Sequence, residues 1–184
     1  MKTIKVLVCA VLLGIITVNA QENQPDNIEF GVKGGVHLSK FKSGSNKNKT
    51  GLMAGFFLQK EWSEKFAFRA ELLYAALGAK SKVNKNKVKL NYINVPLLLK
   101  FYPVDKLSIE GGGQLGYLLG GKGQGFQKSN YKKFDYGISA GIGYLISENL
   151  ELGIRYYRGL ANISKVNNAS LKNTAFQLSL ALTL

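Results

Sequence analysis

From residue 28 to the end of the chain, apolar and polar residues alternate with the period of two that is typical of β-strands. In the stretch "IEFGVKGGVHLSK", for example, Phe30, Val32 and Val36 share one face, whereas Lys33 and His37 share the other. Each alternating segment has about ten residues, the length of a strand that crosses a bilayer at a tilt. Eight segments follow this pattern, and they lie at 28–40, 51–61, 66–76, 91–101, 107–119, 135–144, 151–157 and 177–184.

The connections between these segments alternate in length. Short turns lie at 62–65, 103–106 and 147–149, and long stretches rich in lysine, asparagine, serine and glycine lie at 41–50, 79–89, 120–133 and 164–172. In outer-membrane barrels the short turns face the periplasm and the long loops face outside. The sequence therefore predicts an all-β fold, an eight-stranded antiparallel up-and-down transmembrane β-barrel over residues 28–184.

Aromatic residues gather near both ends of the predicted strands, where a membrane barrel carries them at the two bilayer interfaces. The group near the short turns consists of Trp62, Phe66, Phe101 and Tyr102. The group near the long loops consists of Tyr74, Tyr117, Tyr131, Phe134, Tyr136 and Tyr156. This distribution favours a band of lipid between two aromatic girdles.

A soluble barrel of the lipocalin type has a similar length and alternation, but its apolar face points inward around a ligand. The polar faces decide between the two, because they mix charged residues with glycines, which are poorly suited to the surface of soluble strands. In a narrow membrane barrel, small residues leave room and opposite charges pair. We therefore expect a lumen filled by side chains, with a charge network of Lys33, Arg69, Glu71, Lys100, Glu110, Asp135, Glu151 and Arg155.

The segment before the barrel has the features of an export signal. Lys2 and Lys5 precede a continuous apolar run that is too short for a comfortable transmembrane helix, and small residues precede Gln21. We expect residues 1–20 to be a cleaved signal peptide and residues 21–27 to be a flexible lead. Cys9, the single cysteine, lies in the signal, so the mature chain carries no disulfide, as suits a bacterial envelope protein.

The chain is strongly basic, with a formal net charge of +14, and this charge is unevenly placed. The four long stretches together hold fourteen lysines and no acidic residue. An exported protein rarely meets nucleic acid, so anionic lipid is the expected partner. Contacts to lipopolysaccharide are expected from Lys47, Lys49, Lys82, Lys85, Lys87, Lys128 and Lys132. Solvated loops of biased composition, without a ligand, are the open alternative.

The stretch "IEGGGQLG" at 109–116 has the G-x-G-x-x-G spacing of a dinucleotide-binding loop. Such a loop requires a helix after its third glycine, so that the helix N-terminus meets the phosphates. Here Gly116 is followed by "YLLGG", which continues an alternating strand. We interpret Gly112 and Gly116 as lumen-facing residues that make room, and the motif as a coincidence of barrel packing.

Several stretches resemble the PorT-like outer-membrane β-barrel family of Gram-negative bacteria. They include "LNYINVPLLLKFYP" (90–103), "IEGGGQLGYLL" (109–119) and "KFDYGISAGIGYLISENLELGIRYYRGLANI" (133–163). The resemblance implies an outer-membrane domain without a known enzymatic activity or cofactor, inserted by the barrel-assembly machinery. Some relatives assist secretion or gliding systems. Such chains often end in an aromatic residue, whereas this one ends in Leu184.

Two other functions are compatible with the sequence. Lipid-modifying barrels use a histidine with a serine and a carboxylate near the outer rim, and His37 with Ser39 lies at a comparable place. The lumen charges are also compatible with a small-solute channel, although an eight-stranded barrel is only wide enough for its own side chains. We expect a structural or interaction role with no enzymatic activity, cofactor or metal. Its loops would be presented to lipopolysaccharide or to an envelope protein partner.

Overall fold

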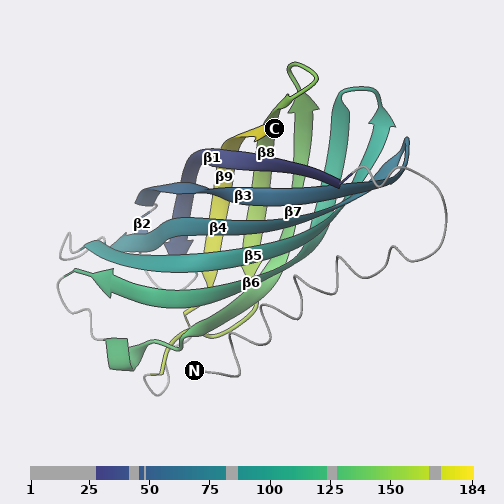
Figure 1. Ribbon diagram of the computed structural model, residues 1–184. Helices are drawn as coiled ribbons and strands as arrows, with labels where there is room; N and C mark the ends of the chain where they lie inside the picture. Colours follow the sequence, from purple (N-terminus) through teal and green to yellow (C-terminus); the bar gives the residue numbers. More distant parts are fainter. Residues whose placement is uncertain (1–27, 42–45, 48, 82–86, 124–127, 166–170) are drawn as a thin grey trace.

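The protein, seen in a computed structural model, is a closed antiparallel β-barrel (Figure 1). The structure describes residues 28–41, 46–47, 49–81, 87–123, 128–165 and 171–184. The predicted signal peptide and lead, residues 1–27, lie outside the described residues. None of the helices in the described part is long and apolar enough to cross a membrane.

Nine strands and one short 3₁₀ helix make up the described fold. They are β1 (Ile28–Phe41), β2 (Asn46–Lys47), β3 (Lys49–Ser63), β4 (Phe66–Ser81), β5 (Lys87–Val104), β6 (Leu107–Lys122), η1 (Lys128–Asn130), β7 (Phe134–Leu145), β8 (Leu150–Gly159) and β9 (Asn173–Thr183). Eight strands pair with their neighbours in chain order, and β1 pairs with β9 to close the ring. The short β2 adds two residues against the end of β4. The predicted eight-stranded barrel is confirmed.

The apolar face of each strand points outward. In β9, Leu178, Leu180 and Leu182 are 42–48% exposed, whereas Gln177 and Ser179 between them are only 5–6% exposed. A soluble barrel has the opposite arrangement, since its apolar side chains fill the interior. The outward apolar band identifies a barrel that is solvated by lipid, and it excludes the lipocalin-type alternative.

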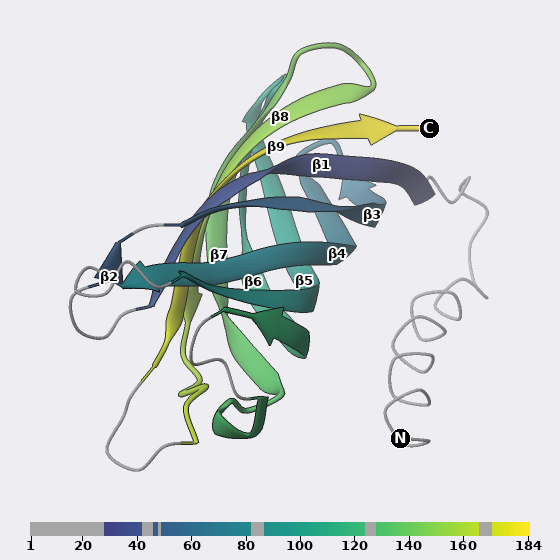
Figure 2. The same ribbon diagram turned by 90° about the vertical axis from the view of Figure 1, so that its left-hand side faces the viewer.

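The two ends of the barrel differ (Figures 1 and 2). Three tight connections, after β3, β5 and β7, form what we call the turn end. The other end, which we call the loop end, carries η1 and the longer connections. Strands β4, β5 and β6 have 16–18 residues, whereas β8 has only 10, so the wall is tallest on the β4–β6 side.

Strand pairing continues further toward the loop end than the sequence predicts. The stretches expected to be loops contain the start of β3 at Lys49, the end of β4 at Ser81, the start of β5 at Lys87 and the end of β6 at Lys122. The expected strand boundaries at the loop end were wrong because the hydrogen bonds between strands join backbone groups, and polar side chains do not prevent them from forming. The strands therefore extend several residues beyond the alternating apolar residues from which they were predicted.

The lumen is closed toward the loop end by an apolar plug. Its buried members are Met53, Ala75, Leu77, Leu90, Tyr92, Leu118, Tyr157, Ile163 and Ala175. Ile163 lies in the connection after β8, which folds into the barrel mouth: its carbonyl oxygen accepts a hydrogen bond of 2.8 Å from the Lys132 amide. Tyr131 packs against this plug and bridges to Ser164. The prediction of Tyr131 in the outer aromatic girdle was therefore wrong.

Gly112 marks a very close approach of two strands. A Cβ atom at this position would lie 2.0 Å from the carbonyl oxygen of Leu97 on β5, whereas a Cβ at the adjacent Gly113 would meet nothing within 4 Å. The two glycines lie on opposite faces of β6, so one is required by the crowded interior and the other faces open space.

We therefore expect Gly112→Val to prevent folding, or to lower the free energy of unfolding by about 1–3 kcal/mol, as overpacking does. Gly113→Val is the matched control and should fold like the unchanged protein. The folded fraction and the urea midpoint, read from the gel mobility of unheated samples in detergent micelles, check this. Equal midpoints for the two variants would contradict the close approach at Gly112.

Candidate functional site: a lumen charge network and a basic collar

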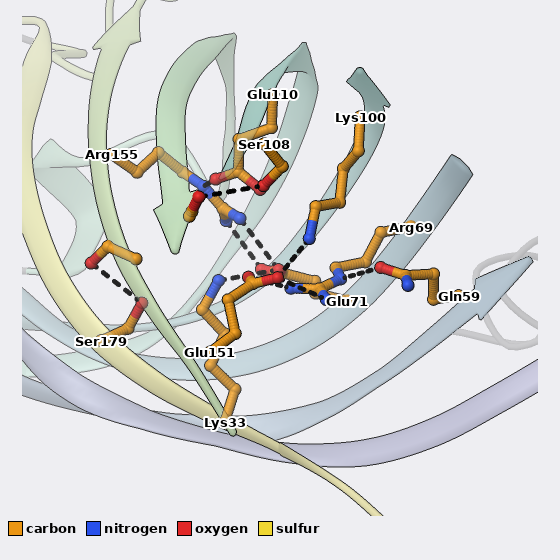
Figure 3. Close-up of polar contacts among 12 residues, drawn as sticks. Lys33, Gln59, Arg69, Glu71, Lys100, Ser108, Glu110, Glu151, Arg155 and Ser179 are labelled. Atoms are coloured by element: carbon orange, nitrogen blue, oxygen red, sulfur yellow. Dashed lines mark hydrogen bonds and ion pairs between the residues drawn. The ribbon is translucent and has the colours of Figure 1, made fainter. Parts of the chain in front are cut away.

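Two arginines bridge the full width of the lumen between β4 and β8, which lie opposite each other in the ring (Figure 3). Arg155 of β8 donates to both carboxylate oxygens of Glu71 on β4, at 2.7 and 2.9 Å. In the reciprocal pair, Arg69 of β4 donates to both oxygens of Glu151 on β8, at 2.7 and 3.2 Å. Such bidentate pairs fix geometry as well as charge.

Three other strands join this layer. Lys33 of β1 donates to Glu71 at 2.8 Å. The Arg155 Nε atom donates to Glu110 of β6 at 2.6 Å, and Lys100 of β5 forms an ion pair with Glu151. Seven charged side chains from β1, β4, β5, β6 and β8 thus form the charge network, with four cations and three carboxylates. Its ion pairs fall into two groups, one around Glu71 with Lys33, Arg155 and Glu110, and one around Glu151 with Arg69 and Lys100.

All seven side chains are buried, which is tolerable only because each has a partner. Gln59, which the sequence analysis did not single out, extends the network: it accepts from Arg69 Nε at 2.9 Å and donates to Glu29 at 2.9 Å. Arg69 also lies 4.4 Å from the ring centre of Phe57, a favourable cation–π distance. The alternation already placed Gln59 on the inward face of its strand, two residues from Phe57.

Asp135 does not belong to the network, contrary to the prediction. It lies nearer the loop end, where its Oδ2 atom accepts a hydrogen bond of 2.7 Å from the Asn173 amide. Asn94 and Tyr92 adjoin it, since both lie within 3.4 Å of a Cβ placed at Gly116. These three neighbours of Asp135 among the described residues are uncharged. Alternation assigns a residue to the lumen but not to a height within it.

His37 is buried in the lumen, with 1% of its surface exposed. Among the described residues, neither ring nitrogen has a hydrogen bond to a serine hydroxyl or a carboxylate. The Ser39 hydroxyl instead donates to the Lys49 carbonyl oxygen at 3.3 Å. The described residues therefore do not assemble the serine–histidine–acid arrangement that a hydrolytic mechanism requires.

At the loop end, the outward face of nearly every strand leads to a cation. We call this set the basic collar, and it consists of Lys40 (β1), Lys80 (β4), Lys89 (β5), Lys122 (β6), Arg158 (β8) and, shortly before β7 and β9, Lys132 and Lys172. The acidic residue at this end among those described, Asp135, is buried inside the lumen. The collar residues that the structure describes as exposed, Lys89, Lys122, Lys132 and Arg158, therefore give the outside of the barrel one sign of charge at this end.

Exposed aromatic residues lie below the collar. Tyr156 and Phe176 are in tilted contact with ring centres 4.7 Å apart, and Tyr117 and Phe134 meet edge to face at 5.3 Å. The girdle at the turn end includes Phe66 and Phe101, 5.1 Å apart. Tyr102, predicted to belong to this girdle, lies on the other face of β5, with its ring 5.3 Å from Lys100 Nζ. It faces the lumen because it immediately follows Phe101.

The lysines predicted to contact lipopolysaccharide have different positions. Lys47 belongs to β2, Lys87 opens β5 and Lys128 opens η1. Lys49 opens β3, and its Nζ atom donates to the Leu77 carbonyl oxygen at 3.2 Å. Lys132 is exposed, whereas Lys82 and Lys85 lie outside the described residues.

Comparison with known proteins gives the family of this barrel. Residues 19–165 match the model of a family described as an outer membrane protein beta-barrel domain. The chain belongs to this family. Membership of this family places the protein in the bacterial outer membrane. No curated protein is similar enough in sequence to count as a relative.

Solved structures with the same fold include two outer-membrane proteins. The chain is 16% identical to Ail, the attachment invasion locus protein of Yersinia pestis, in its complex with the heparin analogue sucrose octasulfate; the match covers 85% of this chain and 99% of Ail, with a TM-score of 0.54. It is 14% identical to Neisserial surface protein A, with 85% and 97% coverage and a TM-score of 0.51. At these identities the likeness shows the fold of the outer-membrane barrel.

The charge network predicts a sharp difference between two arginines of β8. Arg155→Met leaves Glu110 without its cation and Glu71 with Lys33 alone, so the free energy of unfolding should fall by about 3–5 kcal/mol. Arg158→Met, at an exposed position three residues on, should change it by at most about 0.5 kcal/mol. Urea unfolding in lipid-free detergent micelles measures both.

A double variant tests whether the loss comes from the pair itself. Adding Glu71→Gln to Arg155→Met removes the second partner of a pair that the first substitution has already broken, so the double variant should be more stable than the sum of the two single losses implies. If Arg155→Met unfolds at the same urea concentration as Arg158→Met, the network does not stabilise the barrel.

Proposed function

We propose that this outer-membrane barrel is a non-enzymatic protein whose loop end faces outside and whose basic collar binds the phosphate groups of lipopolysaccharide. The loops beyond the collar are then presented to an envelope protein partner or an external ligand. The observation that carries the proposal is the succession, on strand after strand, of an apolar stripe, an aromatic residue and a cation.

The height of the collar fits the level of lipid phosphates. On β5, Lys89 lies twelve residues from Phe101 in the girdle at the turn end. At about 3.3 Å per residue and a tilt of about 45°, this separation is about 28 Å along the membrane normal. The apolar band of an outer-membrane barrel is about 25 Å tall, so Lys89 stands just beyond it.

The electrostatic attraction expected between the collar and an anionic membrane surface also supports binding to lipopolysaccharide phosphates. An exposed lysine or arginine near an anionic membrane surface contributes about 1 kcal/mol, so the four collar residues described as exposed already give a substantial attraction. Ail, crystallised with a heparin analogue, is an example of this fold with a bound polyanionic sugar. The likeness of 90–103 and 133–163 to PorT-like barrels supports a role without catalysis, and insertion by the barrel-assembly machinery.

Two features argue against the alternative functions. The lumen contains the charge network and, above it, the apolar plug, which leaves little room for a solute path. His37 is buried without a serine or acid partner among the described residues, which disfavours a lipid-modifying enzyme. Both features are properties of the interior, so the exposed surface at the loop end is the better place to look for function.

We expect the barrel to retain lipopolysaccharide through detergent purification and to lose most of it when the collar is neutralised. The test variant carries Lys89→Ser, Lys122→Ser, Lys132→Ser and Arg158→Ser, all at exposed positions. The control carries Lys65→Ser and Lys106→Asn at the turn end, where asparagine tolerates the positive φ of residue 106. Quantitative lipid A phosphate analysis per barrel is the measurement. Equal lipopolysaccharide in all three proteins would dismiss the proposal.

A further inference from the structure

On one side of the loop end, three members of the basic collar and two further lysines stand directly opposite one another on neighbouring strands. Lys47 of β2 pairs with Lys80 of β4, and Lys80 pairs on its other side with Lys87 of β5. Further along β5, Lys89 pairs with Lys122 of β6. We call these five residues the lysine ladder, and they cross the end of the tall β4–β6 wall.

Such a register is unfavourable in an isolated protein. Residues directly opposite in antiparallel strands have their Cβ atoms about 5 Å apart, and like charges there destabilise the pairing. The remainder of the collar avoids this arrangement in the described pairings: Lys40 faces Thr174, and Arg158 faces Ile138 and Thr174. The lysine ladder therefore differs from the rest of the collar in register, not only in charge.

The chain offers no carboxylate to relieve the repulsion. The sequence has no acidic residue between Glu29 and Glu61, between Glu71 and Asp105, or between Glu110 and Asp135. Asp135 itself is buried in the lumen. The charge that balances the ladder must therefore come from outside the chain, and an anion that carries several charges would meet several of these lysines at once.

The lysine ladder also stands at the edge of a lipid-facing surface. On β5 the outward row runs from Phe101 through Leu99 to Ile93 and continues to Lys89. Beside it on β6, Gly120 pairs with Asn91, and a Cβ at Gly120 would meet nothing within 4 Å. An amphiphile whose chains lie on this apolar row would therefore place its head group at open space beside the lysines.

We propose that the lysine ladder is a specific binding site for the phosphorylated head group of one lipopolysaccharide molecule, seated on the outer wall formed by β4, β5 and β6. The inference rests on the proposed function and narrows it from the whole ring to one site. The bound phosphates would stabilise the strand ends, because they replace lysine–lysine repulsion by lysine–phosphate attraction. The occupant is a lipid, since the site continues an apolar lipid-facing row.

The test compares two variants that lose the same charge at the same end of the barrel. The ladder variant carries Lys80→Gln, Lys87→Gln, Lys89→Gln and Lys122→Gln. The matched variant carries Lys40→Gln, Lys132→Gln, Arg158→Gln and Lys172→Gln. Full-length barrels in phospholipid nanodiscs are titrated with purified lipopolysaccharide. The ladder variant should bind at least about tenfold more weakly, and the matched variant no more than about threefold more weakly.

A second measurement separates weaker binding from misfolding. In lipid-free detergent at low salt, the ladder variant should unfold at a higher urea concentration than the unchanged protein, because it no longer holds like charges in register. Adding lipopolysaccharide should raise the midpoint of the unchanged protein and leave that of the ladder variant almost unmoved. A ladder variant that is less stable without lipopolysaccharide would overturn the account of the register.

The remaining outcomes are also decisive. Equal weakening of both variants would overturn the specific site while leaving binding by the whole collar intact. No weakening in either variant would remove the site and the proposed function together. Dephosphorylated lipopolysaccharide should not raise the midpoint. Saturable binding of inorganic pyrophosphate at the ladder in the phospholipid nanodiscs, as tight as that of lipopolysaccharide, would show that the anion is soluble and would overturn the assignment to a lipid.

Discussion

The reciprocal pairs of Arg155 with Glu71 and of Arg69 with Glu151 are the interaction on which this barrel depends. A ring of eight strands leaves a lumen just wide enough for side chains, and alternation sends every second residue into it. Charged residues are tolerable there only when each is paired, since stranding one costs several kcal/mol. By joining β4 to β8 across the ring, the two pairs hold opposite walls at a fixed distance. The glycines of the lumen face then fit where neighbouring backbones approach, as at Gly112.

This interior leaves the outside of the barrel to interact with other molecules. The charge network fills the lumen toward the turn end, and the plug with Ile163 and Tyr157 fills it toward the loop end. Apart from the buried Asp135, the acidic residues of the described part lie in the network and near the turns, whereas lysines are concentrated around the loop end. The same segregation of charge has two consequences: paired ions stabilise the interior, and under the proposed function the cations at the loop end meet an anionic surface. The basic collar and its lysine ladder follow from this second part.

The eight barrel strands, their order and the face of most strand residues were predictable because they depend on local alternation and on connection length. Arg155 and Glu71 could be assigned to the lumen in this way, although they are far apart in sequence. Their pairing could not, because it depends on register and shear around the whole ring. Asp135 shows what alternation cannot predict. Its position in the strand places it correctly on the lumen face, but its partner there is Asn173 rather than a cation. Tyr131 was misplaced for a related reason. It lies before β7 and bridges to Ser164 in the connection after β8, a contact between distant stretches that alternation does not show. The lysine ladder also required the register, because the sequence shows only that lysines are abundant.

The central claim is that the paired charges and the apolar plug close the lumen, so that the barrel acts through its outer surface. Ion conductance across planar lipid bilayers tests this claim most directly. The purified barrel, inserted in its folded form as judged by gel mobility, should give no steady conductance above that of the protein-free bilayer in concentrated salt. Reproducible unitary conductance steps, scaling in number with the inserted protein, would contradict the account and would return the lumen charges to the role of a channel lining.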